Sequence, residues 1–170
     1  MMTERRRWVL DAACALAIVG AAACLTAPEG VRLLAFCGPA AHGASWLSGA
    51  PCVAESGGYR LLGRGLDLQV SPACAAADFC CLLAGFLSLL VAWRRWPRRC
   101  QWGVLPAAWA LTIAINAVRL TACWQADLWA RAALPMALWP GVHMAAGTAT
   151  FLLGMTAVFW VMTRPMWRQP

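Results

Sequence analysis

Three residues far apart in the chain, Cys74, Arg119 and His143, are of the types that cysteine-dependent acyl transfer requires. A thiol becomes a nucleophile when a neighbouring imidazole takes its proton, and the same imidazole then returns the proton to a leaving amine. A guanidinium stabilises the thiolate, or the oxyanion that forms on the attacked carbonyl. These residue types therefore indicate attack of Cys74 on a carbonyl group, provided that the fold brings them together.

The residues around Cys74 predict the start of a helix. Ser71 is a favourable N-cap, and Pro72 suits the first helical position, where its missing N–H is no loss. Cys74 then lies in the first turn, where free N–H groups and the positive end of the helix dipole favour a thiolate. Asp78 follows one turn later. The alternative interpretation is a small packing residue below a helix cap, because free cysteines are often buried apolar groups.

Arg119 and His143 each have a polar or small companion within one helical turn. Arg119 lies in an apolar run, where a charge usually faces the protein interior, and Asn116 shares its helix face. The alternative for Arg119 is a side chain that reaches to lipid headgroups. Gly147 leaves room beside the ring of His143, for which a solvated interfacial histidine is the alternative. Asn116 and Asp78 are candidates for orienting the reacting side chains.

The composition places these residues in a membrane. The chain of 170 residues is 62% hydrophobic and 12% charged, with a mean hydropathy of +0.62, and a soluble domain of this size could not bury so much apolar surface. We therefore expect one integral membrane domain, residues 1–170, in contact with the lipid bilayer. All 14 basic residues are arginines that lie beside apolar runs, which indicates cytoplasmic loops and not a nucleic-acid partner.

Four apolar runs predict transmembrane helices, at residues 8–27, 73–93, 102–124 and 142–163. A cleaved signal peptide is the alternative for the first run. Arginine clusters at residues 5–7, 94–99 and 164–168 place both termini in the cytoplasm and residues 28–72 outside the plasma membrane. The predicted fold is an all-α integral membrane protein, a bundle of about four transmembrane helices.

The outer segment, residues 28–72, carries the rest of the predicted structure. Residues 31–53 are moderately apolar but interrupted by glycines and prolines, which favours a broken interfacial or re-entrant piece over a fifth span. Residues 59–62 and 66–70 predict a small extracytoplasmic β-hairpin with a turn at residues 63–65. This hairpin delivers the chain to Cys74 and offers an edge strand to an extended substrate.

The nine cysteines give no support to a metal site, because no Cys-x-x-Cys pair occurs among them. Cys37 and Cys52 lie in the outer segment and could form a disulfide there. Five others fall in apolar runs and are expected to be packing residues: Cys14, Cys24, Cys80, Cys81 and Cys123.

The predicted topology brings the three reactive residues to one membrane face. Cys74 begins a helix that runs inward, Arg119 lies near the end of an outward helix, and His143 begins another inward helix. All three are therefore expected at the outer face of the membrane, where they could form a single site.

In this order and placement the sequence resembles the exosortase/archaeosortase family, and its short length is most similar to the small type called exosortase K. The resemblance rests on Cys74, on the Asn-x-x-Arg pattern of Asn116 and Arg119, and on His143 followed by Gly147. One departure is Ala75-Ala76, where the family often has a small residue followed by glycine.

The resemblance implies a membrane-embedded cysteine transpeptidase or peptidase. Its substrates would be exported proteins with a C-terminal motif, an apolar helix and a basic tail, and Cys74 would form a thioester that an amine or water resolves. No metal or organic cofactor is implied. Two alternatives of other classes are a membrane thiol-disulfide oxidoreductase and a non-enzymatic membrane assembly subunit, and the latter leaves Arg119 and His143 without a role.

Overall fold

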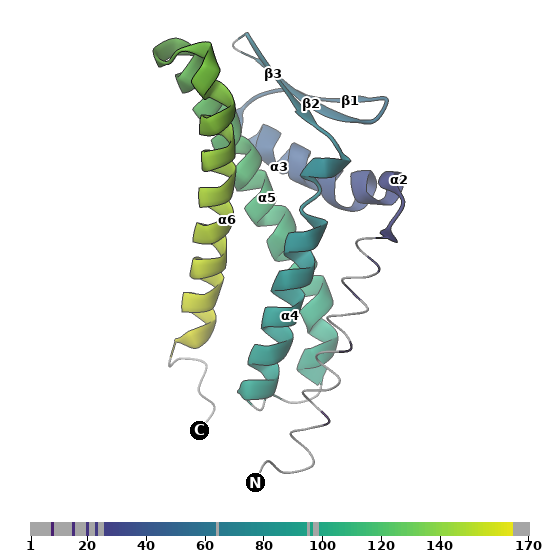
Figure 1. The fold of residues 1–170 in the computed structure, drawn as a ribbon. Helices are drawn as coiled ribbons and strands as arrows, with labels where there is room; N and C mark the ends of the chain where they lie inside the picture. The colour runs from purple at the N-terminus through teal and green to yellow at the C-terminus, as the bar shows by residue number, and fades with distance from the viewer. Residues whose placement is uncertain are drawn as a thin grey trace. The chain divides into compact units, whose positions relative to one another are not determined.

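The computed structural model describes residues 8, 15, 20, 23, 26–63, 65–94, 96 and 99–164 (Figure 1). The predicted first span, residues 8–27, thus lies almost entirely outside the described residues. The elements in chain order are α2 (Glu29–Arg32), a π-helical turn (Leu33–Cys37), α3 (Gly38–Ser48), β1 (Cys52–Glu55), β2 (Gly58–Gly63), β3 (Leu66–Val70), a 3₁₀ turn (Pro72–Cys74), α4 (Ala77–Trp93), α5 (Arg99–Ala133), a second 3₁₀ turn (Met136–Leu138) and α6 (Trp139–Thr163).

These elements belong to two compact units. The first, here called the α4 unit, comprises Met1–Pro28 and Ala76–Thr112. The second, here called the sheet unit, comprises Glu29–Ala75 and Ile113–Pro170. Cys74, Asn116, Arg119 and His143 all belong to the sheet unit.

Three of the described helical segments are long and apolar enough to cross a membrane, Pro72–Trp93, Trp102–Ala133 and Met136–Thr163, as expected for a membrane protein. The helices extend beyond the two predicted spans that face each other in sequence, because α5 continues to Ala133 and α6 begins at Trp139. The expected loop at residues 125–141 is therefore reduced to a few residues around Pro135. Residues 125–133 are alanine-rich and contain neither glycine nor proline, so nothing in them ends the helix.

The expected helix start at Ser71 and Pro72 is present, but it is a separate 3₁₀ turn and not the first turn of α4. Cys74 lies in a 3₁₀ turn closed by its own N–H, which donates to the carbonyl of Ser71 at 2.8 Å. The Ser71 side chain makes no capping hydrogen bond. Ala76 then has a left-handed backbone conformation, with φ 54° and ψ 29°, and α4 begins only at Ala77. Local capping preferences are weak, and the contacts of the turn with other elements override them.

The sheet has three antiparallel strands in the order β1-β2-β3, so the predicted hairpin at residues 58–70 is present and a third strand, β1, extends it. Leu66 and Val70 are buried and Asp67 is exposed, as the alternation in the sequence predicts. On the exposed face, Arg60 forms ion pairs with Glu55 at 2.9 Å and Asp67 at 3.1 Å. These cross-strand pairs join all three strands.

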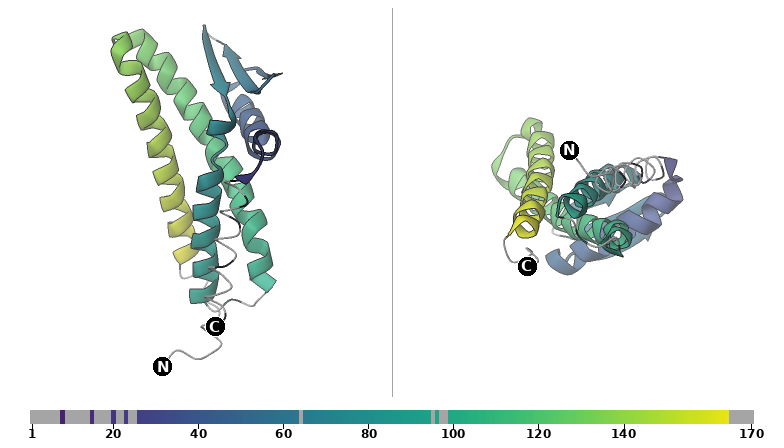
Figure 2. Two further views of the ribbon diagram at one scale, coloured as in Figure 1. Left: turned by 45° about the vertical axis from the view of Figure 1, so that its right-hand side comes forward. Right: turned by 90° about the horizontal axis from the view of Figure 1, so that it is seen from below.

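Residues 29–48 form a helical segment that continues through Gly38-Pro39 and Gly43, and the break expected within residues 31–53 occurs only at the left-handed Gly49, before β1. Pro39 directly follows the π-helical turn, in which the N–H of Gly38 donates to the carbonyl of Leu33, so the change of hydrogen-bond register lies next to the proline. α3 packs along the sheet, as both Figure 1 and Figure 2 show. Gly43 brings α3 close to α5, since a Cβ on Gly43 would lie 2.9 Å from the Cβ of Ala117. The sheet unit is thus built on the C-terminal half of α5.

In the α4 unit, one face of α4 is buried, including Cys80 and Leu83. The thiol of Cys81 donates to the carbonyl of Gly20 at 3.7 Å. A Cβ on Gly20 would lie 3.7 Å from the side chain of Leu105 in the N-terminal half of α5. Cys80 and Cys81 therefore take part in helix packing.

Candidate functional site

Asn116 is the centre of the candidate site. Its side chain has no exposed surface, although it lies in an apolar helix. The amide nitrogen Nδ2 donates to the backbone carbonyl of Cys74 at 2.8 Å, and Oδ1 accepts a hydrogen bond from Nη1 of Arg119 at 3.2 Å. One buried amide thus joins the backbone of the expected nucleophile to the expected oxyanion-stabilising group.

The guanidinium of Arg119 turns back along α5 and does not extend toward the C-terminal end of the helix. Its bond to Asn116, three residues earlier, requires this direction. Its central carbon lies 5.0 Å from the centre of the Phe151 ring on α6. Nε is buried and has no hydrogen-bond partner in the described part of the chain. Arg119 is therefore half-buried against α6, with its Nε enclosed.

Gly147 provides the space for Arg119. A Cβ at this position would lie 3.1 Å from Nε of Arg119 and 3.5 Å from Sγ of Cys123. The sequence predicted that Gly147 makes room beside the ring of His143. In the structure its closest neighbours are Arg119 and Cys123, because the backbone of α6 approaches α5 at this glycine.

Cys74 shares a backbone acceptor with another cysteine. The thiol of Cys37 donates to the carbonyl of Ser71 at 3.2 Å, and the same oxygen accepts the N–H of Cys74. Burial raises the pKa of the Cys37 thiol to about 11, the nearby Cys74 thiolate adds to the rise, and Arg32 opposes it. Cys37 consequently stays protonated in neutral solution, whereas the side chain of Cys74 is partly exposed.

The other predicted site and disulfide residues have different surroundings. Cys37 and Cys52 are both free, so the disulfide considered for them is absent. Burial raises the pKa of the Cys52 thiol also. Ser71 contributes its carbonyl oxygen and not a capping hydroxyl. Asp78 is exposed on α4, and the left-handed Ala76 separates it from Cys74, so the expected one-turn relation between them does not hold.

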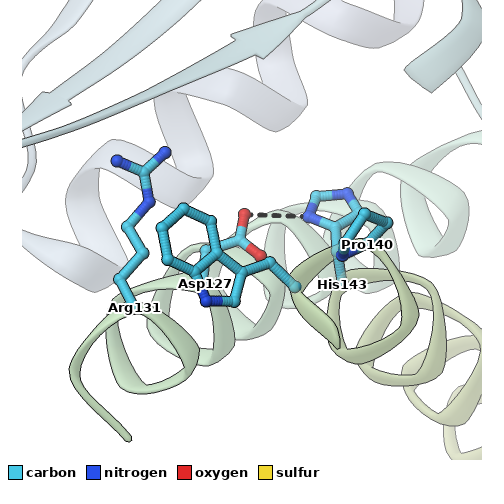
Figure 3. A pocket seen from close by; sticks show the side chains of 5 residues that line it. Asp127, Arg131, Pro140 and His143 are labelled. Atoms are coloured by element: carbon cyan, nitrogen blue, oxygen red, sulfur yellow. Dashed lines mark hydrogen bonds and ion pairs between the residues drawn. The ribbon is translucent and has the colours of Figure 1, made fainter. Parts of the chain in front are cut away.

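His143 has a carboxylate partner that the sequence analysis missed. Its Nδ1 lies 2.9 Å from Oδ2 of Asp127, as the dashed line in Figure 3 marks. Asp127 falls between the predicted spans 102–124 and 142–163, in what would be a loop, whereas the structure places it on α5. Asp127 has the spacing from Asn116, Arg119 and Cys123 that puts residues on one helix face. A sequence analysis that continued the helix past residue 124 would therefore have included Asp127 in the site.

A shallow pocket of about 220 Å³ opens beside this pair, lined by Asp127, Arg131, Trp139, Pro140 and His143 (Figure 3). The indole N–H of Trp139 donates to the carbonyl of Leu134 at 3.1 Å, which fixes the ring. The central guanidinium carbon of Arg131 lies 5.2 Å from the centre of that ring. The pocket therefore combines an aromatic ring, a cation beside that ring, and the Asp127–His143 pair.

α6 comes close to α5 at two points between the His143 pair and the Cys74–Asn116–Arg119 group. The thiol of Cys123 donates to the backbone carbonyl of His143 at 3.6 Å. Gly147, which touches Arg119, follows His143 by one helical turn, about 6 Å along the axis. The imidazole of His143 and the thiol of Cys74 are not hydrogen-bonded to each other within the described ranges. The structure therefore has two groups of side chains, one around Asn116 and Arg119 and one around Asp127, along one face of α5.

Among the residues that the structure describes, no group of three or more His, Cys, Asp or Glu side chains could hold a metal ion. The sequence matches no protein-family model, no curated protein and no solved structure. The interpretation of the site consequently rests on its own geometry and on the order of its residues.

Proposed function

We propose that this chain is a membrane-embedded cysteine transpeptidase or peptidase of the exosortase type, which removes a C-terminal sorting signal from exported proteins. The observation that carries the proposal is the Asn116 side chain, which binds the Cys74 backbone with one end and Arg119 with the other. This amide holds the turn that carries the Cys74 thiol next to the guanidinium of Arg119. Such an arrangement would stabilise negative charge that develops between the two groups during the reaction.

The proposed reaction uses Cys74 as nucleophile and His143 as acid and base. The thiol proton passes to the imidazole, directly or through one water, and the thiolate attacks the scissile carbonyl. Arg119 stabilises the oxyanion. The C–N bond then breaks, the imidazolium gives its proton to the leaving amine, and a thioester remains on Cys74. An acceptor amine or water attacks the thioester while His143 takes its proton, and the thiol is restored.

The membrane arrangement that we propose follows the distribution of the arginines. Residues 8–27 form a fourth span, both termini are cytoplasmic, and the site opens on the extracytoplasmic face. The apolar surface of α6 supports a lipid neighbour, since Met144, Leu152 and Phe159 are exposed in the described chain. A substrate with an apolar helix before a basic tail would lie in the same bilayer.

The test follows a tagged exported protein with such a C-terminal sequence in cells that carry each variant. Cys74→Ala should abolish processing while the protein remains inserted, because alanine fits the same turn. Cys80→Ala is the matched control, because Cys80 is a buried packing residue of α4. Arg119→Lys should also fail, since lysine lacks the planar group that binds Asn116 and an oxyanion together. Normal processing by Cys74→Ala would refute the proposal.

The thiol-disulfide oxidoreductase alternative depends on Cys37, since Cys37 and Cys74 bind the same Ser71 carbonyl. The two functions differ in their need for this second thiol. Under the transpeptidase proposal, Cys37→Ala leaves processing intact. Under the alternative, loss of either cysteine abolishes disulfide exchange, and a mixed disulfide of Cys74 accumulates in the Cys37→Ala variant.

A further inference from the structure

The contact between Asp127 and His143 restricts where the proton of the imidazole ring can lie. Nδ1 of His143 lies 2.9 Å from a carboxylate oxygen of Asp127. An ionised carboxylate only accepts hydrogen bonds, so the proton between the two atoms belongs to Nδ1 whether the ring is neutral or charged. In the neutral ring the lone pair is therefore on Nε2.

The surroundings keep this pair together. The Asp127 side chain is 16% exposed and that of His143 is 36% exposed, so the carboxylate is the more enclosed partner. The backbone of His143 is held from the other side by the Cys123 thiol at 3.6 Å. Arg131 lines the same pocket, but within the described chain it forms no ion pair and lies over the ring of Trp139. His143 is thus the ion-pair partner of the Asp127 carboxylate in the described chain.

We propose that Asp127 is a positioning residue for His143, which fixes the Nδ1–H tautomer and makes Nε2 the atom that takes and returns protons. The catalytic use of Nε2 rests on the function proposed above, whereas the tautomer itself does not. The thiol proton of Cys74 moves to Nε2, Nδ1 keeps its proton, and Asp127 stays ionised beside the imidazolium. Without Asp127 the neutral ring exchanges between tautomers, and the one with hydrogen on Nε2 has no lone pair there to receive a proton.

The tautomer is read from the nitrogen resonances of the purified protein labelled with ¹⁵N-histidine, recorded in detergent micelles over a range of pH. The chain has two histidines, so His42→Gln assigns the spectrum. The wild type should show the neutral form of His143 protonated on Nδ1. Asp127→Ala should shift both resonances toward the values of an exchanging mixture. Arg131→Gln is the matched control, because it alters the other charged residue of the pocket, and it should leave the tautomer unchanged.

Two results would overturn the proposal: a wild-type neutral ring protonated on Nε2, or the same spectrum for His143 in Asp127→Ala as in the wild type. If Asp127→Ala does not fold, the wild-type spectrum alone still decides which nitrogen carries the proton.

The processing assay adds a second measurement. Asp127→Ala should lower kcat by about 10²–10⁴-fold with little change in KM, and Asp127→Glu should restore part of the loss. If the wild-type tautomer is as proposed but kcat is unchanged in Asp127→Ala, the catalytic part of the proposal is wrong. Normal processing by Cys74→Ala would instead refute the proposed function and leave the assignment of the tautomer intact.

Discussion

Ala76, two residues after Cys74, has the only positive φ of a non-glycine residue in the described chain, with φ 54° and ψ 29°. A Cβ in this conformation costs about 1–2 kcal/mol, because it approaches the following carbonyl. Ala76→Gly removes that cost but gives the unfolded chain more freedom, which opposes the gain by about 0.4–1 kcal/mol. The net expectation is a protein that is more stable by about 0.5–1 kcal/mol.

The neighbouring Ala75→Gly is a control of matched chemistry and opposite expected sign. Ala75 has a right-handed backbone, with φ −64° and ψ −21°, and only 2% of its surface is exposed. Glycine there gains no relief of strain, loses a buried methyl group worth about 0.8 kcal/mol, and adds the same unfolded-state freedom. Ala75→Gly should therefore destabilise the protein by about 1–2 kcal/mol.

Thermal unfolding of both purified variants in the same detergent measures the difference. For a chain of this length, the expected gain raises the Tm of Ala76→Gly by about 1–4 °C, while Ala75→Gly unfolds at a lower temperature than the wild type. If both variants lose stability to a similar extent, Ala76 is not strained, and the reasoning about the turn after Cys74 is wrong.

Three further predictions concern the sheet unit. Asn116→Ala leaves buried hydrogen-bonding groups unpaired and should lower the free energy of unfolding by about 1–3 kcal/mol in denaturant titrations. Asn116→Asp should lower the free energy of unfolding by less than Asn116→Ala does, but the variant should process no substrate. Gly147→Ala should lower the Tm, because its Cβ would lie 3.1 Å from a guanidinium nitrogen, whereas Gly141→Ala, with nothing within 4 Å, should raise it slightly. For Cys37, the folded pKa of about 11 exceeds the ordinary thiol pKa of 9.0, so its contribution to stability is complete below pH 9.0 and is lost as pH rises toward about 11. Unfolding titrations should show that Cys37→Ala has a weaker pH dependence over this interval.

The parts of the fold that the sequence predicts are those with a regular local pattern. The alternation in residues 66–70 gives β3, and the three-residue spacing of Asn116 and Arg119 gives their shared hydrogen bond. The strand β1 was missed because it has four residues, mostly exposed, and therefore no alternation of buried and exposed positions. Its partner is β2, and such pairing is a tertiary contact that a single sequence does not specify.

The errors at the site have related causes. Trp124 resembles an interfacial residue at the end of a span, but it is 2% exposed and α5 continues past it. The loop assigned there removed Asp127 from the list of site residues. The turn at Ala76 was missed because alanine has no local preference for positive φ, and only contacts with the rest of the chain impose it.

The unpaired charge of Arg119 has a consequence for the chemistry of the site. Within the described chain, Arg119 forms no ion pair with a carboxylate, and Asn116, its hydrogen-bond partner, is neutral. Such a charge is costly in an apolar helix, and an aspartate at position 116 would reduce the cost. It would also remove the attraction for a second anion and place an oxygen against the carbonyl of Cys74. A neutral amide keeps the guanidinium in place and leaves its charge available. Under the proposed function, this charge is available to the oxyanion that forms on the attacked carbonyl.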